Sequence, residues 1–372
     1  MEMDEAIKRA MWAALALDRE SQAISEADSL KQSLEELLAL PFEQRVETIL
    51  CSRDQYDSPK LASVLLERSR SCAGSDPESS FELAALADLV ARRARSNAAW
   101  RPFAIDLLAL AIALRGNARR IRGKYGEAQR LFERALRILD RGSGDPVAFG
   151  DIRALEGSLL LDLYRHADAE AAVRQAIEAF QECGEKHRLG RALMQLSIIQ
   201  EDAGDPEKAI ESLRTALEHL DLNQEPRLGV QAYCNLAAFV TEAGDPLQAR
   251  EILAAHPLPA DIDERTRLKR GWIESRIQTA LGNHEAAAET LSRLRGEFQR
   301  LGDTNSAAMV SLDLALAFAR QGLISQERQV AAETLLLLQE EAPPQEIWAA
   351  QVLLKQAADA EVANSARLAS GH

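Results

Sequence analysis

The chain has 372 residues, of which 47% are hydrophobic and only 5% aromatic, and its formal net charge is −14. A molecule this acidic repels phosphate backbones and anionic lipid surfaces, so its overall charge argues against a general nucleic-acid binder and against a membrane-surface protein. The composition favours closely packed helices over β-sheet, and four widely scattered cysteines exclude a small disulfide-stapled scaffold, so we predict an all-α fold with reduced thiols.

The first 58 residues have an irregular helical pattern. The opening run MEMDEAIKRAMWAALAL is acidic and amphipathic and lacks the basic start of a secretory signal. No stretch of the chain contains the roughly 18 apolar residues of a membrane span, so we expect a cytoplasmic protein. Two or three helices are predicted between residues 4 and 53, and we assign residues 1–58 to an N-terminal helical cap or docking element.

Residues 59–103 predict a divergent first repeat. One helix begins around Leu61 and a second spans Phe81 to Ala94, with the turn-rich segment CAGSDPESS between them. The periodicity is helical here, but the small residues that mark later repeats are not regularly placed.

A self-similar unit returns about every forty residues in the segment 104–340. Each unit has a turn between two helical runs, centred on Gly123, Gly204, Gly244, Gly282 and Gly322. The second run of each unit places small and bulky residues on one helical face in a repeating register, namely Ala128, Phe132 and Ala135, then Ala169, Val173 and Ala176, then Ala209, Leu213 and Ala216, then Ala249 and Leu253. A recurring helix-turn-helix predicts a stacked solenoid.

Two Gly-Asp-Pro turns indicate how helices end and restart, at Gly204–Pro206 and Gly244–Pro246. Glycine supplies the left-handed residue after a helix, aspartate caps the next helix, and proline is tolerated at its first position. After the array, residues 341–372 are assigned to a C-terminal capping helix and a flexible tail ending in ANSARLASGH.

The repeats resemble the tetratricopeptide repeat family, whose unit is about 34 residues long. The match is best from Gly116 to Ala135, where Tyr125 also stands in the expected place. The extra residues lie between units, as in the long-period repeats of the regulatory regions of MalT-like bacterial activators. The resemblance implies an α-α superhelix, a right-handed solenoid. Two departures stand out: arginines replace apolar residues at 115 and 119, and the turn near His166 lacks glycine.

The residues that enzymes need are not arranged for catalysis. The six histidines have no metal-ligand spacing, and neither a phosphate-binding loop nor a G-x-S-x-G motif is present. We therefore predict no enzyme activity, no catalytic residues, no cofactor and no metal site.

The charge distribution is the strongest local anomaly. Between Ala91 and Gly142 there are thirteen basic and four acidic residues, which leaves −23 for the rest of the chain. Arg115, Arg119 and Arg122 form a basic stripe along one helical face. One hypothesis makes this stripe a docking site for an acidic segment or for RNA, and the alternative is that helices from the first 58 residues neutralise it.

The resemblance implies that the first helix of each unit lines an inner groove that binds a partner. Carried over residue by residue, it predicts the groove residues Asn117, Arg120, Asp162, Gln195, Glu201, Asn235, Glu242, Trp272 and Arg276. The acids among them argue against capture of a C-terminal carboxylate and favour a basic or mixed segment.

The function predicted from these features is a non-catalytic scaffold that binds a protein or peptide partner as an adaptor or as a regulatory subunit of another effector. The alternative is a ligand-gated sensor, in which a signalling peptide or small metabolite controls a separate effector chain. RNA binding through the basic stripe is a third hypothesis, although we expect neither a nucleic-acid nor a membrane partner.

Overall fold

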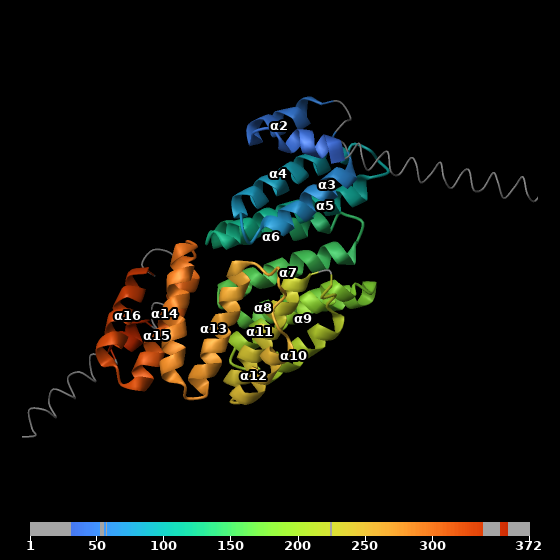
Figure 1. The fold of residues 1–372 in the computed structure, drawn as a ribbon. Helices are drawn as coiled ribbons and strands as arrows, with labels where there is room; N and C mark the ends of the chain where they lie inside the picture. The colour runs from blue at the N-terminus through green and yellow to red at the C-terminus, as the bar shows by residue number, and fades with distance from the viewer. Residues whose placement is uncertain (1–30, 53–55, 57, 224, 338–349, 356–372) are drawn as a thin grey trace, which may run out of the picture. The chain divides into compact units, whose positions relative to one another are not determined.

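The computed structural model describes residues 31–52, 56, 58–223, 225–337 and 350–355. This part of the chain is all-α and contains no β-strand. Two compact units divide the protein, one within Met1–Cys183 and the other within Gly184–His372, and each is a series of packed helix pairs (Figure 1). The predicted fold class is therefore confirmed. No helix of the described ranges is long and apolar enough to cross a membrane.

The first unit begins with a short helical stretch at 31–38 and continues with helices of 10 to 21 residues. These helices are α2 (Phe42–Cys51), α3 (Pro59–Cys72), α4 (Pro77–Ala94), α5 (Arg101–Ile121), α6 (Tyr125–Leu139), α7 (Pro146–Asp162) and α8 (His166–Cys183). Consecutive helices pack as the pairs α3/α4, α5/α6 and α7/α8, and the first helices α3, α5 and α7 also contact one another.

The second unit repeats the same arrangement. Its helices are α9 (Lys186–Asp202), α10 (Pro206–His219), α11 (Pro226–Glu242), α12 (Pro246–Ala255), α13 (Glu264–Ala280), α14 (His284–Arg300), α15 (Thr304–Gln321) and α16 (Ile324–Leu337). The pairs are α9/α10, α11/α12, α13/α14 and α15/α16. The predicted divisions at 58, 103 and 340 stay predictions. Residues 1–30 of the expected cap at 1–58, and most of the tail at 341–372, lie outside the described residues.

The Gly-Asp-Pro turns have the predicted geometry. Asp205 accepts a hydrogen bond from the backbone N–H of Lys208 at 3.2 Å, and Asp245 accepts one from Gln248 at 2.9 Å. Helices α10 and α12 then begin at the prolines. A side-chain cap of this kind stabilises a helix start by about 1 kcal/mol.

The turn that lacks glycine keeps the left-handed backbone of the other turns. Tyr164 has φ +56°, and in the described chain it is the only residue other than glycine with a positive φ. Its N–H bonds to the carbonyl of Leu161, which closes the C-terminal turn of α7. Because a side chain in this conformation costs about 1 kcal/mol, the close packing of α7 and α8 must hold the turn in place.

The repeated small residues form the contacts between paired helices. Ala128 and Ala135 are fully buried, and Phe132 between them is 1% exposed. Gly116 on the preceding helix faces them, where an added Cβ would lie 3.3 Å from Leu131 Cβ. Burial of a side chain such as Phe132 contributes about 2 kcal/mol, so the register predicted from the sequence stabilises the packing of the paired helices.

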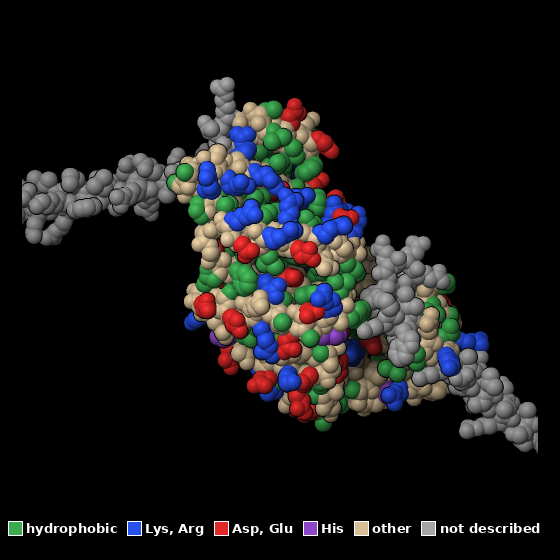
Figure 2. Space-filling model, turned by 180° about the vertical axis from the view of Figure 1, so that it is seen from behind, with side chains coloured by type: hydrophobic (Ala, Val, Ile, Leu, Met, Phe, Trp, Pro, Cys, Tyr) green, Lys and Arg blue, Asp and Glu red, His purple; other side chains and the backbone are tan. Residues whose placement is uncertain are grey.

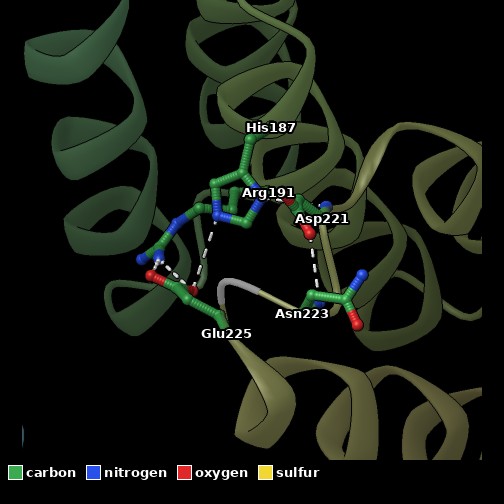
Figure 3. A network of polar contacts seen from close by, with 5 residues as sticks. All are labelled: His187, Arg191, Asp221, Asn223 and Glu225. Carbon is green, nitrogen blue, oxygen red and sulfur yellow. Dashed lines mark hydrogen bonds and ion pairs between the residues drawn. The ribbon is translucent and has the colours of Figure 1, made fainter.

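Polar contacts fix the extra residues that separate the repeats. The linker between α10 and α11 is tied to α9, where Arg191 Nη1 contacts both carboxylate oxygens of Glu225 at 2.7 and 2.8 Å (Figure 3). The backbone N–H of Asp221 donates to His187 Nδ1 at 3.1 Å, and Asp221 accepts from the N–H of Asn223. This linker is therefore a defined part of the second unit.

Candidate functional site

The first helices of the second unit bring four predicted groove residues into one polar cluster. Arg276 on α13 lies 2.5 Å from Glu242 at the end of α11. Glu242 shares a hydrogen bond with Glu201 of α9. Trp272, one turn before Arg276, completes the predicted set, so a single face of these helices carries three ionisable groups and an indole.

Asp313 of α15 also belongs to this cluster, and the sequence analysis did not identify it. Its Oδ2 accepts a hydrogen bond from Trp272 Nε1 at 2.5 Å and lies 3.9 Å from Arg276 Nε. Asp313 follows Trp272 by about one repeat, so the forty-residue spacing was a signal for it. We call Glu201, Glu242, Trp272, Arg276 and Asp313 the acidic cluster.

The acidic cluster contains three carboxyl groups and one guanidinium, so its charges do not balance. Burial, together with the hydrogen bond and charge of Glu242, raises the pKa of Glu201 to about 8, and Arg276 offsets only part of this rise. Burial also raises the pKa of Asp313, against the influence of Arg276 and Trp272. Glu201 therefore holds a proton at neutral pH, shared with Glu242.

Arg276 is the single positive group among these acids. Burial alone would lower its pKa, but the carboxylates of Asp313, Glu242 and Glu201 outweigh burial and raise it. The side chains of Arg276, Glu242 and Asp313 keep exposures of 37%, 32% and 27%. The cluster is thus poor in positive charge and still reachable from solvent, which suits it to a second cation.

The protonation of Glu201 leads to a prediction about pH. Unfolded Glu201 loses its proton near its ordinary pKa of 4.5, whereas the folded protein retains it to about pH 8. Between these values the folded state binds the extra proton, so stability falls as pH rises, with a slope of at most about 1.4 kcal/mol per pH unit. Glu201→Gln should remove this contribution, as measured by urea unfolding of the full chain across the range.

The matched control for the pH prediction is Glu211→Gln, an exposed residue on α10. This variant should keep the wild-type pH dependence. An unchanged slope in Glu201→Gln would show that Glu201 is ionised in the folded protein at neutral pH.

The remaining predicted groove residues lie elsewhere. In the first unit, Arg120 of α5 bonds to Asp162 of α7 at 2.7 Å and to Asn117 at 3.0 Å, which cross-links two first helices. Gln195 and Asn235 are half-buried on α9 and α11, about two turns before Glu201 and Glu242. The nine predicted residues therefore form a four-residue group, a three-residue group and two separate amides, and their role in binding stays a prediction.

The basic stripe pairs with acids of its own unit. Arg115 contacts Asp88 at 3.2 Å, Arg119 contacts Glu127 at 3.3 Å, and Arg122 pairs with Glu78. Asp88 and Glu78 are on α4 and Glu127 is on α6. Among the described residues, α4 and α6 supply the acids that pair with this stripe, whereas the alternative that helices of the first 58 residues neutralise it stays a prediction.

Metal and thiol chemistry have no evident centre in the described residues. No group of three or more His, Cys, Asp or Glu side chains is placed to hold a metal ion there. Cys234 is buried, and burial raises the pKa of its thiol to about 11, so it is a poor nucleophile at neutral pH.

Comparisons with known proteins agree with the helical repeat fold. The family model of the tetratricopeptide repeat matches residues 190–218, which cover most of α9 and α10 and include Glu201. No curated protein matches the sequence significantly. The chain thus carries the tetratricopeptide repeat that its sequence predicted, while the likeness to MalT-like activators stays a prediction.

Two solved structures are similar to this chain in fold. Aspartyl phosphate phosphatase F from Bacillus subtilis is 13% identical, with a TM-score of 0.54 over 80% of each chain. A signal transduction ATPase with numerous domains from Pyrococcus horikoshii, which has a tetratricopeptide repeat sensor, is 12% identical, with a TM-score of 0.51 over 82% of this chain and 50% of that one. At these identities the likeness concerns the helical solenoid fold alone.

Proposed function

We propose that the protein is a non-catalytic scaffold that binds a protein or peptide segment on the first-helix face of its second unit. The acidic cluster receives a lysine or arginine side chain of that segment, which makes the protein an adaptor or a regulatory subunit of another effector. The observation that carries this proposal is the excess of three carboxyl groups over one guanidinium at an accessible site.

The chemistry of the cluster matches a basic side chain in two ways. An added cation would pair with Glu242 and Asp313, which now share Arg276, and would favour loss of the proton from Glu201. The ring of Trp272 is half-buried and held by Asp313, so it offers a rigid apolar surface for an aliphatic stem or a guanidinium.

A binding experiment with short synthetic peptides tests this proposal. Peptides with one central arginine are compared with peptides that carry glutamine or glutamate there, by calorimetry on the full chain. We expect the arginine peptides to bind best, and the variant Glu242→Gln/Asp313→Asn to bind them about tenfold or more weakly because two charge-assisted contacts are lost.

The control for the charge change is Glu211→Gln/Glu251→Gln, two exposed residues on α10 and α12. It removes the same number of charges outside the cluster and should bind like the wild type. An equal loss in both variants would mean that only net charge matters, and a preference for glutamate peptides would refute the proposal. Turnover of a substrate by the purified chain would refute its non-catalytic part.

A ligand-gated sensor is the second candidate. Its support is the fold likeness to the Pyrococcus horikoshii protein, whose tetratricopeptide repeat region is a sensor. A sensor of this kind would bind small metabolites or signalling peptides, so calorimetry against both classes separates it from a scaffold that binds only protein segments.

A further inference from the structure

A second charged surface lies on the first unit. Three arginines from α4, α5 and α6 lie near enough to Arg115 to act on its charge, and two of these four guanidinium groups share a single carboxylate, Asp88. Arg92 Nε donates to Asp88 Oδ1 at 2.8 Å and Arg115 Nη1 donates to Oδ2 at 3.2 Å. Arg119 and Arg134 are near enough to Arg115 to act on its charge.

The packing beneath these arginines holds them in place. The guanidinium carbons of Arg119 and Arg115 lie 4.0 and 5.0 Å from the centre of the Phe81 ring, so one aromatic face supports both. Arg119 and Arg115 are 20% and 25% exposed. The sequence pattern expects apolar residues there, and α4 accommodates the arginines by presenting Phe81 and Asp88.

Among the described residues, positive charge at this surface exceeds the charge of the acids that pair with it. Burial lowers the pKa of Arg115, whereas the charge of Asp88 raises it. The positive charges of Arg134, Arg92 and Arg119 lower this pKa further. The buried Nε of Arg115 has no hydrogen-bond partner among the described residues. An added anion would relieve the repulsion among these guanidinium groups.

Helix α6 extends the surface with exposed arginines. Arg130, Arg134 and Arg137 follow a spacing of four and three residues, so they share one face of this helix. No ion pair in the described chain involves Arg130 or Arg134. Figure 2 shows Lys and Arg side chains gathered over the part of this unit that holds α4 to α6. By contrast, the exposed face of α14 pairs Arg300 with Glu297.

We propose that this arginine surface, formed by Arg92, Arg115 and Arg119 with the exposed arginines of α6, docks an acidic segment of a partner protein. It uses other residues than the acidic cluster and has the opposite charge preference. A short run of carboxylates fits four guanidiniums confined to three helices. A long polyanion would run on from them over a chain that is otherwise strongly acidic, which disfavours RNA.

The test uses the full chain and a fluorescent glutamate-rich peptide, with a glutamine-for-glutamate peptide and a single-stranded RNA of equal charge as comparison probes. Fluorescence anisotropy is measured at low and at physiological salt. We expect the glutamate-rich peptide to bind best at physiological salt, and the variant Arg92→Gln/Arg130→Gln/Arg134→Gln to bind it about tenfold or more weakly.

The matched control is Arg214→Gln/Arg250→Gln/Arg293→Gln, three exposed arginines on α10, α12 and α14. It changes the net charge equally and should bind the peptide like the wild type. Circular dichroism and the urea midpoint verify that both variants are folded. Equal weakening in both variants, absence of peptide binding by the wild type, or displacement of the peptide by the RNA at physiological salt would each overturn the proposal.

Discussion

Replacing Gly142 with alanine should destabilise the first unit by about 3 kcal/mol. Gly142 lies in the linker between α6 and α7, and an added Cβ would overlap Asp106 Oδ1 and lie 2.9 Å from its Cγ. Asp106 is 1% exposed, and its carboxylate accepts hydrogen bonds from the hydroxyl and backbone N–H of Ser143. The methyl group would displace this carboxylate, so overpacking adds to the loss of buried hydrogen bonds.

Two further variants make the Gly142 prediction specific. Gly126→Ala on α6 meets no atom within 4 Å, and because alanine favours helices it should stabilise the unit by about 0.5–1 kcal/mol. In an Asp106→Ala background, Gly142→Ala should cost much less, since the clash is gone. Urea unfolding of the full chain measures all of these changes. Equal effects of Gly142→Ala in both backgrounds would show that the linker moves freely around the methyl group.

The features that the sequence predicted well are those set by neighbours along the chain. Asp205 and Pro206 specify a helix start through bonds within one turn, and this start forms as expected. Ala128 and Ala135 lie on one face of a single helix, so their burial follows from the helical period. Local interactions of this kind do not depend on which helix packs next.

The features that the sequence could not predict depend on contacts between repeats. Tyr164 takes the left-handed place of a glycine because the packing of α7 and α8 fixes the turn. Arg115 is balanced by Asp88 and Phe81, which precede it by about thirty residues on a helix whose orientation the sequence does not give. Counting charges along the sequence therefore located the excess of basic residues but did not show which acids pair with them.

The candidate site was predicted in part for the same reason. The family pattern placed Glu201, Glu242 and Arg276 on successive first helices, and the stack brings them into contact. Asp313 was missed because the last repeat is weakly marked in the sequence, yet its carboxylate holds Trp272. The family pattern thus identifies the helical face that carries the candidate site, whereas the distances between neighbouring helices decide which charged side chains pair.

Arg270→Met should cost the second unit about 3 kcal/mol, which is unusual for an arginine. The side chain of Arg270 is only 8% exposed. Its guanidinium donates to the carbonyls of Leu253 at 2.6 Å and His256 at 2.8 Å, and to Glu274 at 2.8 Å. Helix α12 has 10 residues where α10 has 14, so its last carbonyls need donors from another helix, and Arg270 supplies them.

Cys234 provides a local readout of this role, because it is buried beside Arg270. In a background where the other three cysteines are serine, Arg270→Met should speed thiol labelling of Cys234. Loss of the arginine charge would itself raise the thiol pKa and slow the reaction, so faster labelling reports opening of the α12 end. Arg270→Lys keeps the charge but lacks the planar guanidinium, so its labelling rate should lie between those of the wild type and of Arg270→Met. The control is Arg293→Met, at an exposed position on α14. If Arg270→Met and Arg293→Met had similar urea midpoints, water or backbone rearrangement would satisfy the α12 carbonyls in place of Arg270.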